Sequence, residues 1–439
     1  MWDAGCILDR MSEQESVGRR VQSRIYREGL FGRLPAAPVE PSALERAARR
    51  KLSARAWAYV AGSAGQHRTD AANRAAFDDH PIVPRMLVDV SSRDLGIELL
   101  GRRIPAPVLL APIGALELVH ARSDVELAEG VRELGLPVVI STQGSRPMEE
   151  TAATLGNCPR WFQLYWSSND DLVGSLVRRA EAVGSDAIVV TLDTHTLGWR
   201  TMDLDLGSLP FIRAEGIAQY ISDPIFRRLV EERVANPVAA AEPRPRPTRS
   251  AVAAAVSMAR HWPGNLRENL RSPLPRAAVE TFLDVFSRPS LTWDDLASLR
   301  GHTRLPVLLK GIQHPADAAK AIDHGVDGLI VSNHGGRQVD GAIASLHALP
   351  EVVRETRGRV PVLFDSGIRS GADIYKALAL GADAVLIGRP WVYGLGVGGG
   401  AGARAVMEHL LAELDLTMAL TGARTIEETR ELGLGQDRS

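Results

Sequence analysis

Residues able to donate, accept or carry charge stand at the ends of a series of short apolar runs in this sequence. They are Gln163, Tyr165, Thr191, Asp193, Lys310, Ser332, His334, Arg337, Asp365, Arg369 and Arg389. A lone lysine or aspartate at such a place is more often a solvated charge at the surface. These residues stand at the ends of six of the eight apolar runs, which is hard to explain by structure alone. We therefore interpret these residues as the reactive and binding groups of one site.

The last two run ends have the composition of an anion-binding site. Asp365-Ser366-Gly367-Ile368-Arg369 follows the seventh run, and Gly388-Arg389-Pro390 follows the eighth. Glycines let backbone N–H groups approach an anion closely, and arginines neutralise its charge. Barrels of alternating strands and helices often bind phosphate at this pair of strand ends. The pattern predicts a phosphorylated ligand, with two ordinary turns as the alternative.

The apolar runs also predict the elements that position these residues. Continuous apolar runs indicate strands buried on both faces of a parallel sheet, and helix-like segments alternate with them, as at 124–134, 170–183, 315–324 and 370–380. Eight such units in order favour a closed α/β fold, the (β/α)8 TIM barrel, over an open doubly wound sheet, which is the alternative. The predicted strands are 107–112, 137–142, 161–165, 187–193, 306–310, 328–333, 361–365 and 384–389.

Three regions are predicted along the chain. Residues 1–104 form an N-terminal arm with a helix at 42–60, for which Ser42 and Glu45 have the spacing of a capping box; 105–425 form the barrel, and 426–439 form a C-terminal tail.

The fourth β/α unit is abnormally long, and an insertion at about 201–290 explains its length. The insertion contains an Ala/Pro/Arg-rich stretch at 234–250 that we expect to be mobile. In a barrel, such an insertion lies on the C-terminal face, where active sites are built. A lid over the site is one interpretation, and a tolerated surface insertion or an oligomer contact is the other.

Composition narrows the classes of protein. Lys and Arg total 51 while Asp and Glu total 53, so no basic surplus points to nucleic acid or to an anionic membrane. No apolar run approaches the roughly 20 residues of a membrane helix, and residues 1–10 make a poor signal peptide. Cys6 and Cys158 form neither a metal pattern nor a disulfide framework. We expect a cytoplasmic protein without a metal site.

One segment is far more specific than the rest. Ser332-Asn333-His334-Gly335-Gly336-Arg337-Gln338, followed by Asp340, resembles the active-site signature of the FMN-dependent 2-hydroxy-acid dehydrogenase family. The resemblance covers residues 42–425 and includes the order and spacing of the strand-end residues, as well as the 416–422 segment. It implies a (β/α)8 barrel with FMN as the cofactor.

The resemblance implies roles for the reacting groups. His334 matches the base that removes a proton from the substrate, and Asp193 matches the carboxylate that pairs with it. Lys310 matches the lysine beside the edge of the flavin on which negative charge collects during reduction.

The same resemblance implies a substrate site. Arg200 and Arg337 match the arginines near the substrate carboxylate, which a planar guanidinium suits better than an ammonium group does. Tyr59 and Tyr165 match the two tyrosines that hydrogen-bond the substrate. The implied FMN contacts are, besides Lys310, the residues Pro112, Ile113, Gly114, Ser141, Gln163, Thr191, Ser332, Asp365, Ser366, Gly367, Arg369, Gly388 and Arg389.

The implied reaction oxidises an L-2-hydroxy acid to the 2-oxo acid, with O2 as the second substrate. Gly114, where the oxidases of the family usually have Ala, the 191–200 segment and the insertion after it resemble the lactate 2-monooxygenases, which convert lactate and O2 to acetate, CO2 and water. The alternatives are an oxidase that releases the 2-oxo acid and H2O2, and an inactive barrel that serves as a binding module. The resemblance also implies a homo-oligomer, a tetramer or an octamer.

Three residues depart from the family pattern. Gln143 replaces an aromatic residue that glycolate oxidase carries near its substrate, so the identity of the substrate stays open. His195 stands where many members have Pro, and we interpret it as a loop residue rather than as a second base. Ser366 replaces a Gly of the phosphate loop and is small enough to fit there.

Overall fold

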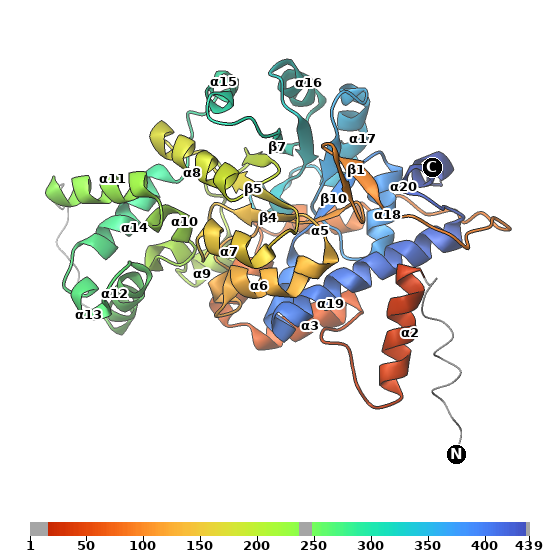
Figure 1. Ribbon diagram of the computed structural model, residues 1–439, viewed down its shortest axis with the longest axis horizontal. Helices are drawn as coiled ribbons and strands as arrows, with labels where there is room; N and C mark the ends of the chain where they lie inside the picture. Colours follow the sequence, from red (N-terminus) through yellow and green to blue (C-terminus); the bar gives the residue numbers. More distant parts are fainter. Residues whose placement is uncertain (1–15, 237–247, 436–439) are drawn as a thin grey trace.

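The centre of the molecule is a closed barrel of eight parallel strands (Figure 1). A computed structural model describes residues 16–236 and 248–435 of the chain. The predicted barrel is confirmed, and every predicted strand is present. In chain order the strands are β3 (Val108–Leu110), β4 (Val138–Ser141), β5 (Arg160–Leu164), β6 (Ile188–Thr191), β7 (Val307–Ile312), β8 (Gly328–Val331), β9 (Val362–Phe364) and β10 (Ala384–Ile387).

The barrel strands are apolar because both of their faces are buried. Nearly all their residues are buried, and β10 pairs with β3 to close the ring. Because all the strands run parallel, their carboxyl ends meet at one end of the barrel. The helices that return between strands are α6 (Ser123–Val131), α7 (Met148–Leu155), α8 (Asp170–Ala182), α16 (Pro315–Asp323), α17 (Ser345–Thr356) and α18 (Gly371–Ala379).

The N-terminal region contains more structure than the sequence predicted. A helix, α2 (Val17–Gly29), lies in the predicted arm, and a hairpin of β1 (Ile97–Leu99) and β2 (Arg102–Ile104) precedes the barrel. The region also contains α5 (Arg68–Ala75). Residues 1–15 of the arm lie outside the described residues.

The single helix predicted at 42–60 is wrong. Two helices, α3 (Pro41–Lys51) and α4 (Ala54–Ala61), are separated by two extended residues, Leu52 and Ser53. The prediction that Ser42 caps the first helix is also wrong, because Glu40 is the N-cap and its carboxylate accepts hydrogen bonds from the N–H groups of Ser42 and Ala43. Pro41 at the first helical position moves the cap to the residue before it.

The C-terminal region is also helical. After β10 the chain forms α19 (Arg389–Thr421), which contains a kink at Gly398 and Gly399, and then α20 (Ile426–Leu432), which packs against α18. Residues 436–439 of the predicted tail lie outside the described residues. Within the described parts of the chain, no helix combines the length and the apolar character needed to cross a bilayer.

The insertion between β6 and β7 is a group of helices on one side of the barrel (left in Figure 1). Part of the stretch expected to be mobile, residues 237–247, lies outside the described residues. The described elements are α9 (Thr201–Asp205), η4 (Pro210–Arg213), α10 (Ala218–Ile221), α11 (Pro224–Ala235), α12 (Arg249–His261), α13 (Leu266–Asn269), α14 (Leu274–Val285), η5 (Trp293–Asp295) and α15 (Leu296–Arg300).

The base of the insertion is joined to the loops that follow β3 and β4. The buried Gln219 side chain accepts a hydrogen bond from Met148 N at 2.8 Å and donates to the carbonyl oxygens of Ser141 and Arg146 at 3.4 and 3.2 Å. In the β3 loop, the Glu117 carboxylate accepts from Gly216 N at 2.7 Å and lies 2.6 Å from His261 Nε2. The inner part of the insertion is therefore fixed to the same loops that carry predicted site residues.

Replacement of Gln219 by leucine should destabilise this junction. Gln219→Leu removes the acceptor for Met148 N and the donor for two carbonyl groups inside the protein. Buried polar groups that lose their partners cost about 1–3 kcal/mol. We expect a lower midpoint of thermal unfolding, measured by circular dichroism. The exposed Gln66, changed to leucine as a control, should leave the midpoint unchanged; an equal effect of both substitutions would disprove the anchoring role.

Candidate functional site

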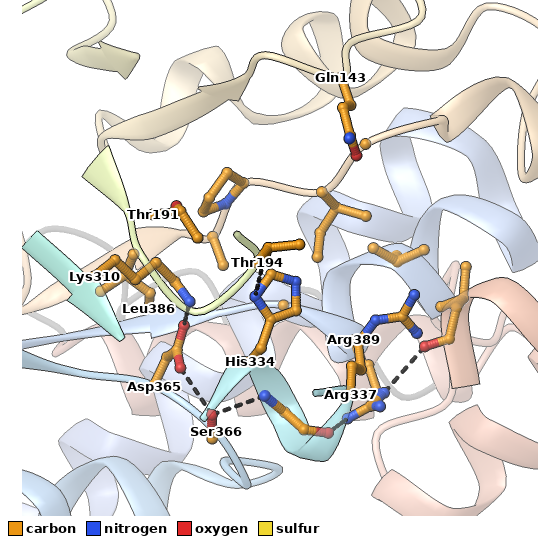
Figure 2. A pocket seen from close by; sticks show the side chains of 18 of the residues that line it. Gln143, Thr191, Thr194, Lys310, His334, Arg337, Asp365, Ser366, Leu386 and Arg389 are labelled. Atoms are coloured by element: carbon orange, nitrogen blue, oxygen red, sulfur yellow. Dashed lines mark hydrogen bonds and ion pairs between the residues drawn. The ribbon is translucent and has the colours of Figure 1, made fainter. Parts of the chain in front are cut away.

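The polar strand ends converge on one cavity that is partly open to solvent. Most of the residues singled out in the sequence line this cavity, as Figure 2 illustrates for several of them. The lining residues among them are Tyr59, Pro112, Ile113, Gly114, Tyr165, Thr191, Arg200, Lys310, His334, Arg337, Asp365, Ser366, Gly367, Arg369, Gly388 and Arg389. Residues from far-separated parts of the chain thus form a single site.

The signature segment forms a turn that needs unusual backbone angles. His334, Gly335 and Gly336 have φ values of 58°, 64° and 74°, all in the left-handed region. A β-carbon on Gly336 would lie 2.6 Å from Asp70 N, so glycine is needed there for space as well as for conformation. The Asn333 side chain accepts a hydrogen bond from Gly336 N at 3.1 Å. This turn after β8 places the His334 ring in the cavity wall.

The His334 ring is oriented by Asp193, which follows β6. His334 Nδ1 lies 2.8 Å from Asp193 Oδ1, and the Thr194 hydroxyl lies 3.0 Å from the same carboxylate oxygen and 3.3 Å from Nδ1. Because an ionised carboxylate can only accept, Nδ1 carries the proton in this pair. Nε2 then keeps its lone pair, and no group of the described residues hydrogen-bonds it.

Burial and charge set the protonation states of this pair. Burial lowers the pKa of His334, although the Asp193 carboxylate opposes that shift, so the ring is neutral near pH 7. Burial on its own would raise the pKa of Asp193. The charge of His334, which is protonated at low pH, the charge of Lys310 and the hydrogen bonds from His334 and Thr194 outweigh burial and hold that pKa at about 2. A neutral imidazole held by an ionised carboxylate can accept a proton at Nε2.

Lys310 is a fixed, buried cation in the wall of the cavity. Its Nζ lies 2.9 Å from Asp365 Oδ2 and donates to Ser332 Oγ at 2.8 Å. Burial is the largest single effect on the pKa of Lys310, and on its own it would lower that pKa. The charges of Asp365 and Asp193 together outweigh burial and raise it. Figure 2 shows how the chain of contacts continues from Asp365 through Ser366 Oγ to the Gly335 backbone. This chain of contacts therefore connects Lys310 to the turn at His334-Gly335-Gly336.

Two guanidinium groups and two phenols gather near His334. The Arg337 guanidinium lies over the Tyr59 ring, 5.2 Å from its centroid, and Arg200 donates to Gln338 Oε1 at 3.1 Å. Burial, together with the Arg200 charge, lowers the pKa of Arg337 to about 9. Burial raises the pKa of Tyr59 and of Tyr165, so both phenols keep their protons. Such a set of donors suits a carboxylate.

FMN, which the sequence resemblance implies, fits the donors that the cavity offers. Arg369 and Thr191 line the cavity, and within the described residues Arg369 Nε and Nη2 and Thr191 Oγ1 are buried and have no hydrogen-bond partner. Burial, followed by the charges of Arg74 and Arg389, lowers the pKa of Arg369 to about 10. Buried donors without acceptors indicate a ligand with an anionic group at Arg369 and polar atoms elsewhere.

Some predicted cofactor residues lie behind the cavity wall. Ser141 and Gln163 hydrogen-bond each other at 3.2 Å, and Ser332 binds Lys310; none of the three lines the cavity. Arg389 lines the cavity, but its guanidinium donates to Asp70 Oδ1 at 2.9 Å and to the carbonyl oxygens of Val60, Gly62 and Gly335. In this structure the Arg389 guanidinium therefore donates its hydrogen bonds to groups of the protein.

The cavity also contains residues that the motifs did not indicate. Phe211, in η4, and Phe286, directly after α14, line it from the insertion, and Leu197 and Thr194 line it from the loop after β6. Nothing in the local sequence marks the two phenylalanines, because they stand far from every motif. His195 is exposed and does not line the cavity, and its Nδ1 lies 3.1 Å from Leu192 O, in agreement with a loop role.

Comparison with known proteins agrees with this geometry. The family model described as FMN-dependent dehydrogenase matches residues 48–434. The FMN-dependent alpha-hydroxy acid dehydrogenase qulF of Penicillium citrinum is 41% identical over 408 residues, with 93% of each chain covered. An L-lactate oxidase of Lysinibacillus sphaericus is 38% identical, over 89% of this chain and 91% of its own.

Solved structures of the same family are similar to this chain in sequence and fold. A crystal structure of mandelate oxidase is 34% identical to this chain, with a TM-score of 0.72 over 91% of this chain and 98% of that one. The family match includes all eight barrel strands and every predicted site residue from Tyr59 to Arg389. This chain belongs to the family of FMN-dependent dehydrogenases and oxidases of 2-hydroxy acids, and FMN is its cofactor.

Proposed function

We propose that this enzyme oxidises L-2-hydroxy acids to 2-oxo acids and that His334 is the base. The observation that supports this role most strongly is the 2.8 Å contact between His334 Nδ1 and Asp193, which leaves Nε2 free within the cavity. The neutral ring can take a proton from the substrate, and the adjacent carboxylate stabilises the imidazolium that results. FMN, when bound, accepts the two electrons that leave the substrate.

The arginine pair would orient the substrate. Arg200 and Arg337 would bind its carboxylate, and the Tyr59 and Tyr165 phenols would donate hydrogen bonds to its oxygen atoms. Lys310, Thr191, Asp365 and Arg369 would hold the cofactor; the buried and unpartnered Arg369 donors support a place for its phosphate. Lys310 adds a positive charge that the Asp365 contact keeps in place.

With lactate and O2 as substrates, we propose the monooxygenase outcome: acetate, CO2 and water. Retention of the 2-oxo acid in an enclosed site favours that outcome, because the acid is then decarboxylated before it leaves. Phe211 and Phe286 help to enclose the cavity, and they come from an insertion that is anchored at its base. The second candidate is an oxidase that releases the 2-oxo acid and H2O2, supported by the similarity to L-lactate oxidases.

Self-association is also part of the proposal. Leu30, Phe31 and Leu34, which follow α2, are 70%, 76% and 86% exposed in the single chain. Apolar side chains grouped on a surface are typical of an interface, and a tetramer or octamer would cover them. The cytoplasmic location expected from the sequence stays a prediction.

The products of lactate oxidation distinguish the two outcomes. Purified enzyme supplied with L-lactate and air should form acetate and CO2 in a one-to-one ratio, with little H2O2, measured by NMR, by trapped 14CO2 and by a peroxidase assay. Catalase should be present in a parallel reaction, because free H2O2 decarboxylates pyruvate in solution. Pyruvate in twice the molar amount of the net O2 consumed, with catalase present to return half of the O2, would rule out the monooxygenase outcome and leave the oxidase.

Removal of the proposed base should abolish reduction but not cofactor binding. His334→Gln keeps a polar side chain of similar size but cannot accept a proton at pH 7. A positioned general base contributes about 10²- to 10⁴-fold to a rate, so anaerobic reduction by lactate in a stopped-flow spectrometer should slow by that factor. The yellow colour of the purified variant should persist. The exposed His195, changed to glutamine as a matched control, should leave the rate unchanged; reduction at a near-normal rate by His334→Gln would refute the role.

The pH dependence should report the His334–Asp193 pair. Because the neutral ring is the active form and burial lowers its pKa, reduction should be fast near pH 7 and decline only below the ordinary histidine value of about 6.5. Asp193→Asn removes the charge that raises this pKa, so the decline should move to still lower pH. The plateau should drop at least ~10-fold, which corresponds to about 1.4 kcal/mol of lost imidazolium stabilisation. A decline that stays in place in Asp193→Asn, with the exposed Asp171→Asn as control, would contradict the pairing.

A further inference from the structure

The side chain of Gln143 lies in the cavity wall, and its amide has no hydrogen-bond partner among the described residues. Gln143 follows β4 and is 7% exposed, and its backbone N–H donates to Ser141 Oγ at 3.1 Å. Among the described residues, no group hydrogen-bonds Oε1 or Nε2 of this side chain. Figure 2 shows no dashed line at the Gln143 amide, which lies apart from His334, Lys310 and Asp365.

An amide that lines the cavity without a protein partner is available to a group on the ligand. Its Oε1 accepts and its Nε2 donates, and each loses hydrogen bonds to water when the cavity is filled. An apolar ligand would leave both atoms unsatisfied, whereas a hydroxyl or amide group on the ligand could satisfy either of them. None of the three groups proposed to react with or bind the 2-hydroxy-carboxylate end of the substrate, His334, Arg200 and Arg337, has a hydrogen bond to Gln143.

Gly114 allows Gln143 to lie close to the backbone of the loop after β3. A β-carbon at Gly114 would lie 2.7 Å from Gln143 Cβ and 3.4 Å from its Oε1, so a larger residue would displace the Gln143 side chain. Leu197, Phe211 and Phe286 line the same cavity with apolar surface. This combination fits a side chain that has an apolar body and carries one hydrogen-bonding group.

The charge of that group follows from the partner that the protein offers. Gln143 is neutral, and the five cations that line the cavity, Arg200, Lys310, Arg337, Arg369 and Arg389, have no hydrogen bond with it. A second carboxylate beside Gln143 would lose its hydration without gaining a paired charge. A neutral hydroxyl or amide avoids this penalty.

We propose that Gln143 is a specificity-determining residue that hydrogen-bonds a neutral hydroxyl or amide group on the side chain of the substrate. The preferred substrates are then L-2-hydroxy acids with an apolar side-chain body that carries such a group, and lactate is a smaller, weaker substrate. This inference rests on the proposed oxidation of 2-hydroxy acids at His334.

Matched pairs of acids test the inference on the holoenzyme. Anaerobic reduction of the bound FMN is followed with L-3-(4-hydroxyphenyl)lactate against L-3-phenyllactate, and with L-2,5-dihydroxypentanoate against L-2-hydroxypentanoate, with L-lactate as reference. A site built to bind a hydroxyl discriminates strongly against the analogue that lacks it. We expect the ratio of reduction rate to dissociation constant to favour the hydroxylated member of at least one pair by ~10-fold or more.

Gln143→Leu, and Gln143→Met if the leucine variant does not fold, should remove or reverse this preference, whereas Gln66→Leu should retain it. Equal efficiency of the paired acids with the unaltered enzyme overturns the inference, and so does a preference that persists in the Gln143 variants. Reduction by lactate without discrimination between the pairs leaves the proposed function standing. A lack of reduction by every acid, lactate included, overturns the proposed function itself.

Discussion

The contact between His334 and Asp193 places the strictest geometric demand on the molecule. It joins residues that follow β6 and β8, two strands that are separated in the barrel by β7. Because the parallel strands of the barrel end at one level, the two part-buried side chains lie 2.8 Å apart. The left-handed turn at His334-Gly335-Gly336 is also needed for this contact, because it directs the His334 ring toward Asp193 after β6. Gln338 adds a further tie, since its Nε2 donates to Asp193 O at 2.7 Å.

Buried charge is distributed so that most ions have a partner and a few do not. Lys310 is paired with Asp365, and Arg389 is paired with Asp70, so these charges are balanced within the chain. Arg369 has no carboxylate partner among the described residues, and two of its three guanidinium nitrogens have no acceptor. An isolated buried cation is costly, so its presence beside the cavity is understandable only if a bound anion completes it. A cofactor phosphate bound at Arg369 would therefore stabilise the folded protein as well as serve the reaction.

The barrel could be predicted from the sequence because its strands are buried on both faces. Continuous apolar runs such as 187–193 have few structural interpretations, and their number and order indicated the closed barrel. The site around His334 could be predicted because its glycines and its polar residues occur together in one short segment. The N-terminal elements were less accessible: Pro41 moved the cap from Ser42 to Glu40, and the short β1–β2 hairpin has too little pattern to stand out. Phe211 and Phe286 could not be predicted as site residues, because only tertiary packing brings them to the cavity.

The division of the cavity wall between the barrel and the insertion has an evolutionary consequence. The groups proposed for proton transfer and for cofactor binding follow the barrel strands, whereas part of the apolar wall comes from η4 and the end of α14. Mutations in those inserted segments can reshape the wall while the strand ends stay as they are. The range of substrates can thus differ between proteins that descend from one ancestor, while the reaction at the strand ends stays the same.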